Sequence, residues 1–372
     1  KRLPILRNIG AGAVLVTFVP SFLAYHELIP PKITSVVTDF FKSTNILSIF
    51  IAAVIVGSIL SMDRTILIKG FAKIFAPLAA GSVVGTIVGT LVGVAVGIPA
   101  FDALFYIVVP IMSGGVGEGA IPLSLGYTGI TGQDNGLILA RILPAVMVGN
   151  LTAIILAGTL SYIGKRKPEW TGNGKLQPGN DDIVGAVEGG NREINVQNIA
   201  AAGMTAVTLY LCGVLAFQQF HFPAPVVMLF LAVLLKLGHM ISPRLEAGSY
   251  IVYKFCLTAI AFPMLFAFGV ALTPWDKLVE GFHPANLLTI VATVTSMVLT
   301  GFFIAKRVNL YPVEGAIVTS THSGMGGAGD IAILTASNRM QLMPFAQIAT
   351  RIGGGITVTL ALIAMAAHYG AQ

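Results

Sequence analysis

A glycine cluster between two short apolar segments, within residues 313–355, constrains the fold more than any other stretch of this chain. The segments GAIVTST and IAILTAS flank a turn that contains Gly324, Gly326, Gly327 and Gly329. Ten helical residues rise about 15 Å, against a hydrocarbon core of roughly 30 Å, so neither segment can cross a membrane alone. Glycine lets the backbone leave helical geometry, but exposed amides cannot face lipid. The pattern predicts a re-entrant hairpin over 309–340 that lines a polar cavity.

Composition places that hairpin in a membrane. The 372 residues are 55% hydrophobic and 10% charged, whereas a soluble chain carries about 25% charged residues. We therefore predict an all-α polytopic membrane protein with lipid as its surroundings. Apolar runs of spanning length occur at about 9–26, 45–61, 75–98, 136–163, 199–218, 223–238, 250–272, 285–304 and 342–368.

A second glycine turn of the same kind lies in the first half of the chain. Gly114–Glu118 reads GGVGE and corresponds to Gly326–Asp330, GGAGD, so a second hairpin is predicted over 101–131. Glu118 precedes Arg141 by 23 positions, and Asp330 precedes Arg351 by 21. Two glycine-broken segments in corresponding halves are typical of a secondary transporter whose site lies between two repeats.

The distribution of lysine and arginine predicts the topology. The polar segment 164–198 separates a first repeat, 1–163, from a second, 199–372. If each hairpin returns to its own side, fifteen Lys and Arg fall on the side of this linker and three on the other, and the remaining four, which lie within spans or a hairpin, are not counted. The positive-inside rule then makes the linker cytoplasmic and the C-terminus external. Hairpin 101–131 enters from outside and 309–340 from inside, so the repeats are inverted. The net charge of +6 reflects this topology and not a nucleic-acid partner.

Arg351 is the strongest candidate for binding a ligand. It stands about nine residues into its span, where an unpaired guanidinium costs several kcal/mol. Its planar fork suits a carboxylate, and the nearby glycine turns offer backbone amides to the same anion. A structural pair with Asp330 or Glu314 is the alternative. Half-helices that begin at Gly117 and at Gly327 would direct their positive ends at the same ligand.

Four further residues are candidates for coupling. Glu118 and Asp330 are embedded acids that could take a proton, coordinate a cation or pair with Arg141 and Arg351. His322 titrates near neutral pH, but a hydrogen-bonded structural histidine is the simpler interpretation. Arg141 could be a second anion ligand or a partner for Glu118.

Other features have simpler explanations. Lys254 lies near the start of its span and Arg339 near the cytoplasmic end of the second hairpin, and snorkelling accounts for a charge at either place. Four glycines spaced four apart between Gly81 and Gly93 favour close helix packing. Walker motifs and zinc-ligand spacings are absent from the sequence, and we expect a protein that is not an enzyme and uses no cofactor.

Two segments, SGGVGEGAIPLS and HSGMGGAGDIAILTASNRMQLMPFAQIATRIGGG, closely resemble the bacterial 2-hydroxycarboxylate transporter family, and the resemblance covers essentially the whole chain. It implies secondary transport of citrate, malate and related acids in the cytoplasmic membrane. It also implies a homodimer and elevator-type movement of a transport domain. Arg351 matches the family arginine that binds the substrate carboxylate. The turns match the substrate-contacting loops, which here comprise Gly115, Val116, Gly117, Met325, Gly326, Gly327, Ala328 and Gly329.

Departures from the family pattern bear on the coupling ion. The sodium–citrate symporters carry Asn-Arg-Gly-Gly-Ser-Gly-Asp where this chain has Gly324 to Asp330, and an asparagine where it has Val116. A cation-site side chain, a second substrate arginine and a serine are thus replaced. We expect proton coupling or substrate–product exchange of malate or citrate. A sodium symporter with sodium near Asp330, or an anion channel, is the alternative.

Overall fold

Helices are the regular elements throughout the part of the chain that the computed structural model describes, which comprises residues 11–44, 46–62, 64, 68, 71–178, 195–220, 224–271 and 275–370. Five helices in these residues are long and apolar enough to cross a membrane: Ala72–Ala95, Asn135–Arg166, Val196–Phe220, Pro284–Arg307 and Phe345–Tyr369. The all-α prediction is confirmed, and the apolar helices are those expected of a membrane protein.

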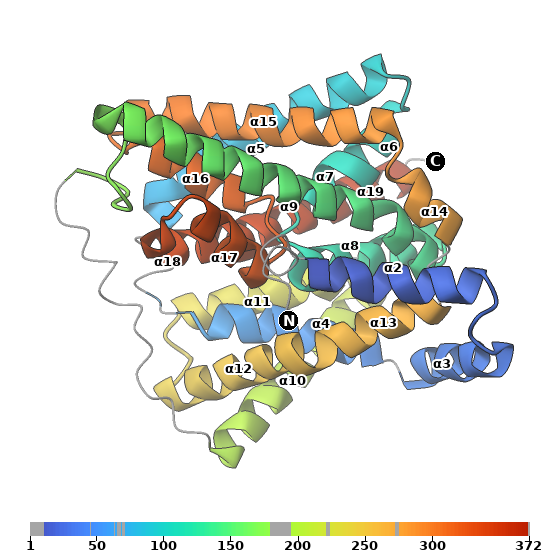
Figure 1. Ribbon diagram of the computed structural model, residues 1–372. Coiled ribbons are helices and arrows are strands. Elements are labelled where there is room, and N and C mark those ends of the chain that lie inside the picture. The colour runs from blue at the N-terminus through green and yellow to red at the C-terminus, as the bar shows by residue number, and fades with distance from the viewer. Residues whose placement is uncertain are drawn as a thin grey trace.

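The helices form two bundles that face each other (Figure 1). The hairpin bundle consists of α5 (Phe71–Ala95), α6 (Ala100–Asp102), α7 (Val109–Ile111), α8 (Ile121–Thr131), α9 (Asn135–Arg166), α15 (Pro284–Arg307), α16 (Pro312–Thr321), α17 (Gly327–Ala336), α18 (Met343–Ile348) and α19 (Gly354–Gly370). The flanking bundle consists of α2 (Ala11–Tyr25), α3 (Pro31–Thr44), α4 (Ile46–Leu60), α10 (Val196–Phe220), α11 (Ala224–Leu237), α12 (Pro243–Phe255) and α13 (Ala261–Ala271). The short α14 (Trp275–Glu280) contacts α2 and α9, one from each bundle.

Close packing of α5 on α15 fixes the outer wall of the hairpin bundle. The glycine series of α5 faces Met297, Thr293 and Thr289 of α15. A Cβ built on Gly85 would lie 3.2 Å from the Met297 Cβ, so larger residues there would push the helices apart. The prediction that these glycines serve helix packing is confirmed.

Both glycine turns break a helix, as predicted. In the first, α7 ends at Ile111 and a π-helical turn, η3 (Val116–Ala120), leads into α8. In the second, α16 ends at Thr321 and α17 begins at Gly327. The backbone has a positive φ at Gly114 (92°), Gly115 (100°) and Gly326 (71°), a conformation that favours glycine. Re-entry into the membrane and the inverted relation of the halves stay predictions.

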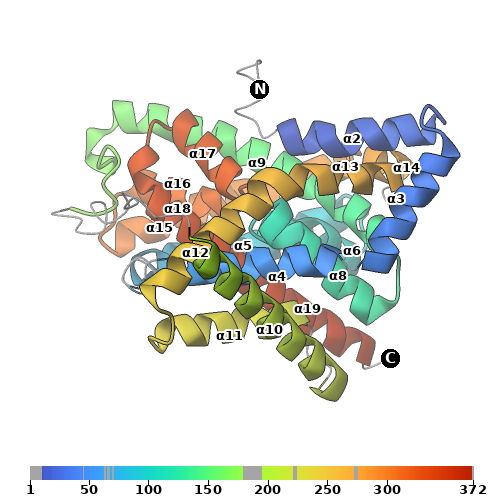
Figure 2. The same cartoon turned by 90° about the horizontal axis from the view of Figure 1, so that it is seen from below.

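Most predicted spans agree with the helices to within four residues. The exception is 250–272, because α12 already begins at Pro243, and two short helices, α3 and α14, are additional. Helix α3, which the apolar runs did not predict, packs beside α13 in the flanking bundle (Figure 2). Its sequence mixes apolar with polar residues, so it contains no continuous apolar run long enough to predict a span. The predicted linker 164–198 overlaps the last three residues of α9 and the first three residues of α10, and residues 179–194 lie outside the described part.

The side chain of Arg339 does not snorkel to the membrane surface, contrary to the prediction from the sequence. Its side chain is 5% exposed, and its Nε donates to Glu314 Oε1 at 3.0 Å. Glu314 also accepts hydrogen bonds from Thr171 Oγ1 (2.7 Å) and from the amide of Gly172 (2.9 Å). The start of the linker therefore folds onto the base of the second hairpin. Snorkelling was wrong because a buried carboxylate compensates the charge locally.

Candidate functional site

The tips of the two hairpins meet, although more than 200 positions separate them in the sequence. Gly115 packs against the backbone of Met325 and Gly326 so closely that a Cβ at Gly115 would overlap them. A Cβ on the neighbouring Gly114 would lie 3.3 Å from the Cα of Gly354 in the last span. The absence of side chains at these glycines is what allows the three segments to converge. Helix α17 and η3 both begin at this junction, so their N-terminal ends lie beside each other.

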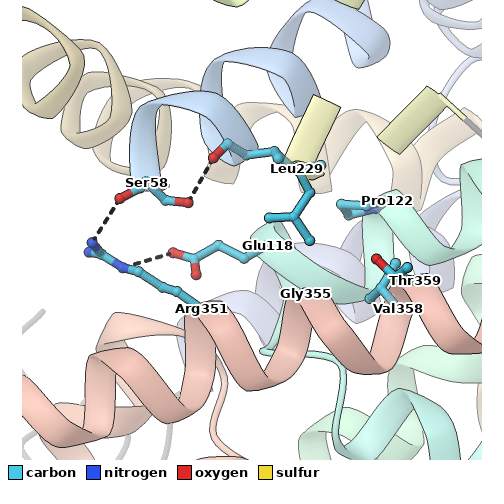
Figure 3. Close-up of a pocket in the computed structure, with 9 residues that line it drawn as sticks. Ser58, Glu118, Pro122, Leu229, Arg351, Gly355, Val358 and Thr359 are labelled. Atoms are coloured by element: carbon cyan, nitrogen blue, oxygen red, sulfur yellow. Dashed lines mark hydrogen bonds and ion pairs between the residues drawn. The ribbon is translucent and has the colours of Figure 1, made fainter. Parts of the chain in front are cut away.

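Arg351 lies next to this junction, in a π-helical turn between α18 and α19 (η8, Ala349–Gly353). Its side chain is 10% exposed, and its Nε lies 4.0 Å from Oε1 of Glu118 on the first hairpin. Nη1 donates to the carbonyl of Ser58 in α4 at 3.4 Å. Figure 3 shows the guanidinium between these two partners. The ion partner of Arg351 is thus Glu118, whereas the alternatives from the sequence were Asp330 and Glu314.

Tyr253 completes this cluster from the flanking bundle. Its hydroxyl donates a hydrogen bond to Glu118 Oε1. The centroid of its ring lies 4.5 Å from the guanidinium carbon of Arg351, which is within the range of a cation–π contact. The second carboxylate oxygen of Glu118 is buried and has no hydrogen-bond partner among the described residues. The Arg351–Glu118 pair is therefore long, incompletely satisfied and held from both bundles.

A small cavity opens beside the pair, between the bundles. Its walls come from α4 and α11 on one side and from the first hairpin and last span on the other, and comprise Ile55, Ser58, Glu118, Pro122, Leu229, Arg351, Gly355, Val358 and Thr359 (Figure 3). Its volume is about 20 Å³, enough for about one water molecule. A larger ligand can bind at Arg351 only if the surrounding helices move apart.

Asp330 lies near the same junction but makes different contacts. Its Oδ1 accepts a hydrogen bond from Thr350 Oγ1 at 2.8 Å, and the same hydroxyl oxygen lies 3.2 Å from the carbonyl oxygen of Thr321. Asp330 is 1% exposed, and its Oδ2 has no hydrogen-bond partner within the described structure. A buried carboxylate with one free oxygen can take up a proton or bind a cation.

Asn150 is a site residue that the sequence analysis missed. It lies near the middle of α9 and is fully buried, and its Oδ1 accepts from the amide of Met325 at 3.2 Å. Its amide nitrogen has no partner in the described part of the chain. An amide side chain inside the span 136–163 was a usable signal, because such residues tend to mark functional positions in membranes. Tyr253 and Ser58 gave no comparable signal.

The remaining candidates lie at different distances from the junction. His322 is 1% exposed, its Nδ1 lies 3.0 Å from the Ala349 carbonyl, and its Nε2 lies 3.4 Å from Thr357 Oγ1. These contacts fit a structural histidine. Val116 is buried, and Met325 packs against the same apolar core. Gly327 and Ala328 stand in the first turn of α17, with the side chain of Ala328 outside the described part.

Arg141 is not brought to Glu118. Its Nη2 pairs with Oδ1 of Asp102 at 3.2 Å, and its guanidinium carbon lies 3.8 Å from the Tyr106 ring centroid. This cluster lines a separate cavity of about 630 Å³ that also includes Gln133 and His283. Of the two arginines that follow the glycine turns, only Arg351 reaches the junction.

Broken helices whose glycine turns meet beside a buried arginine, at a face shared by two bundles, form the kind of site that secondary transporters use. The comparisons give the family: the chain belongs to the 2-hydroxycarboxylate transporter family, whose model matches residues 1–363.

Named relatives cover nearly the whole chain. It is 50% identical to a citrate/malate-proton symporter of Bacillus subtilis over 99% of this chain and 82% of the relative. It is 38% identical to a Na(+)-malate symporter of the same organism, over 98% and 81%. It is 29% identical to a citrate/sodium symporter of Salmonella typhimurium, over 98% and 83%. These names point to a transporter rather than an enzyme.

Proposed function

We propose that this protein takes up malate and citrate across the bacterial cytoplasmic membrane, coupled to protons or to exchange of substrate for product. The observation that carries the proposal is the Arg351–Glu118 pair, a buried cation at the face between two bundles with a partner that a substrate can replace. The 50% identity to a citrate/malate-proton symporter supports both the substrates and the coupling ion.

Substrate recognition follows from the chemistry of Arg351. A substrate carboxylate can bind its guanidinium bidentately, which the 4.0 Å contact with Glu118 does not. The hairpin tips, Gly115–Gly117 and Met325–Gly329, would supply amides to the carboxylate and the adjacent hydroxyl. With methionine and alanine at Met325 and Ala328, one strong cationic ligand remains. We therefore expect broad selection among 2-hydroxy acids.

Proton coupling follows from what happens to Glu118. In the empty carrier the charges of Arg351 and Glu118 compensate each other. A substrate carboxylate at Arg351 would leave Glu118 as a buried, unpaired anion, which costs several kcal/mol. Proton uptake by Glu118 removes that cost, so substrate and proton bind together. Asp330 is the second candidate for the same role.

Sodium coupling is the alternative that one observation favours. The free Oδ2 of Asp330 is an oxygen ligand in a buried position, and one relative is a Na(+)-malate symporter. A sodium ion needs several oxygen ligands, however, and Val116 and Gly324 offer no side-chain oxygen. Backbone carbonyls would have to complete the site. We therefore favour the proton.

Transport requires the site to open alternately to the two sides. We propose that the bundles shift against each other, because the Arg351 site lies on their common face and its cavity is too small for a substrate. An elevator-type movement of the hairpin bundle, a homodimer, a cytoplasmic linker and an external C-terminus belong to the same proposal. An anion channel would instead need a continuous pathway between the hairpins.

Counterflow in proteoliposomes tests the function. Purified protein is reconstituted, loaded with unlabelled malate and diluted into labelled malate or citrate, with sodium or with choline. We expect saturable counterflow of both acids that continues without sodium. Citrate and malate should compete within about tenfold of each other. Uptake that never saturates and shows no counterflow would indicate a channel and contradict the proposal.

A further inference from the structure

Tyr253 is fixed firmly to the flanking bundle, although its hydroxyl contacts the hairpin bundle. It lies on α12, is 5% exposed, and packs against Gly57 of α4. A Cβ on Gly57 would lie 3.0 Å from the Tyr253 Cβ and 3.1 Å from the carbonyl of Ser249. The glycine thus allows α12 to sit directly on α4, and this packing sets the position of the Tyr253 ring.

Besides the ring of Tyr253 under Arg351, two hydrogen bonds join the flanking bundle to the charged pair. The Tyr253 hydroxyl donates to Glu118, and the Ser58 carbonyl accepts from Arg351. Among the described residues, the charged and titratable groups that interact electrostatically with Glu118 are Arg351 from the last span, Tyr253 from α12 and Asp330 from α17. Helix α4 contributes Ile55 and Ser58 to the cavity, and α11 contributes Leu229. The Tyr253 hydroxyl is therefore the side-chain donor by which the flanking bundle holds Glu118.

These contacts hold together a form of the site that has no room for substrate. The cavity beside Arg351 is about 20 Å³, and the Tyr253–Glu118 hydrogen bond spans the two bundles that must separate to enlarge it. A ligand that binds only the open form has its apparent affinity reduced by the fraction of carriers that are open. Any contact specific to the closed form lowers that fraction.

We propose that Tyr253 is a positioning residue that keeps the empty site closed, by hydrogen bonding Glu118 across the two bundles. The inference rests on the proposed function, because it takes Arg351 as the substrate-binding group. Tyr253 itself need not contact substrate. Its hydroxyl holds Glu118 beside Arg351 until a substrate carboxylate takes over the guanidinium, and the hydrogen bond is then lost as the bundles part.

Tyr253→Phe tests this role, since it removes the hydroxyl and keeps the ring under Arg351. We expect the dissociation constant for malate, measured by equilibrium binding to purified protein, to fall by about tenfold or more, the effect of one hydrogen bond to a charged group. A gain in affinity is not what damage to the fold or loss of a substrate contact would give. An unchanged or increased dissociation constant would overturn the proposal.

Two further variants keep the test decisive. Tyr250→Phe, one turn earlier on α12, is the matched control: the Tyr250 hydroxyl accepts from Lys254 Nζ at 3.2 Å, so its loss should leave malate affinity unchanged. In Gly57→Ala the added Cβ pushes Tyr253 away from its position, so malate binding should tighten by a smaller factor. This variant takes the place of Tyr253→Phe if Tyr253→Phe does not fold. If the unmodified protein shows no counterflow of malate or citrate, the proposed function fails and the role of Tyr253 fails with it. If the unmodified protein shows normal counterflow and neither Tyr253→Phe nor Gly57→Ala binds malate more tightly, only the proposed role of Tyr253 is overturned.

Discussion

The two glycine turns share the pattern GGxG followed by an acid, yet their acids have different environments. Glu118 of the first turn faces Arg351 and Tyr253 at the face between the bundles. Asp330 of the second turn accepts from Thr350 inside the hairpin bundle. The arginines that follow the turns differ as well, because Arg351 reaches the junction and Arg141 pairs with Asp102 elsewhere. Similar sequence in the two halves therefore does not imply similar surroundings for the acids and arginines.

Arg351→Ala should have the largest effect. Removing the guanidinium takes away the ligand for the substrate carboxylate, which should cost about 2–5 kcal/mol, a factor of tens to thousands in malate affinity. Protein yield and thermal stability in detergent serve as the check on folding. Near-normal malate affinity in a folded Arg351→Ala protein would remove Arg351 from the site.

Gly115→Ala should have the next largest effect, because Gly115 lies where the two glycine turns contact each other. Its φ of 100° disfavours any side chain, and a Cβ would overlap the backbone of Met325 and Gly326. We expect counterflow to fall at least about tenfold. Gly129→Ala, in α8 with nothing within 4 Å of an added Cβ, is the matched control and should be close to normal. Equal effects of the two changes would mean that the tips need not meet.

Glu118→Gln separates the acids of the two turns. We expect uptake driven by a pH gradient to fall by about tenfold or more, while exchange falls much less, since exchange need not carry a net proton. Asp330→Asn, measured in the same assays, is the comparison. If Asp330→Asn impairs gradient-driven uptake selectively and Glu118→Gln does not, the coupling roles of the two turns are reversed.

Arg141→Ala should have the smallest effect. Its salt bridge with Asp102 is about one-third exposed, and such pairs contribute about 0–1 kcal/mol. We expect malate and citrate affinities within about threefold of the unmodified protein. A large loss confined to citrate would identify Arg141 as the second anion ligand that the sequence left open.

The sequence predicted the features that arise locally. Apolar runs predicted the spans, and glycine clusters predicted the breaks at Gly114–Gly115 and Gly326, because helix length and backbone freedom depend on neighbouring residues. Arg351 could be singled out from the sequence because a charge deep in a span is costly, whichever residue it pairs with. The sequence did not predict its partner, since Glu118, Ser58 and Tyr253 converge only through packing of distant helices.

Other differences have related causes. The ion pair of Arg339 with Glu314 depends on a linker segment folding back, which no local pattern indicates. Helix α3 has too mixed a composition to register as a span. Asn150 is the exception, because an amide in the middle of an apolar span could have been singled out from the sequence.

The most direct test of the account is uptake of labelled malate into sodium-free proteoliposomes under an imposed pH gradient, acidic outside, with the ionisation of malate held constant. The account predicts accumulation that follows the pH gradient, persists when potassium or choline replaces sodium, and is lost in Glu118→Gln while exchange continues. Accumulation that follows a sodium gradient and ignores pH would contradict proton coupling through the Arg351–Glu118 pair.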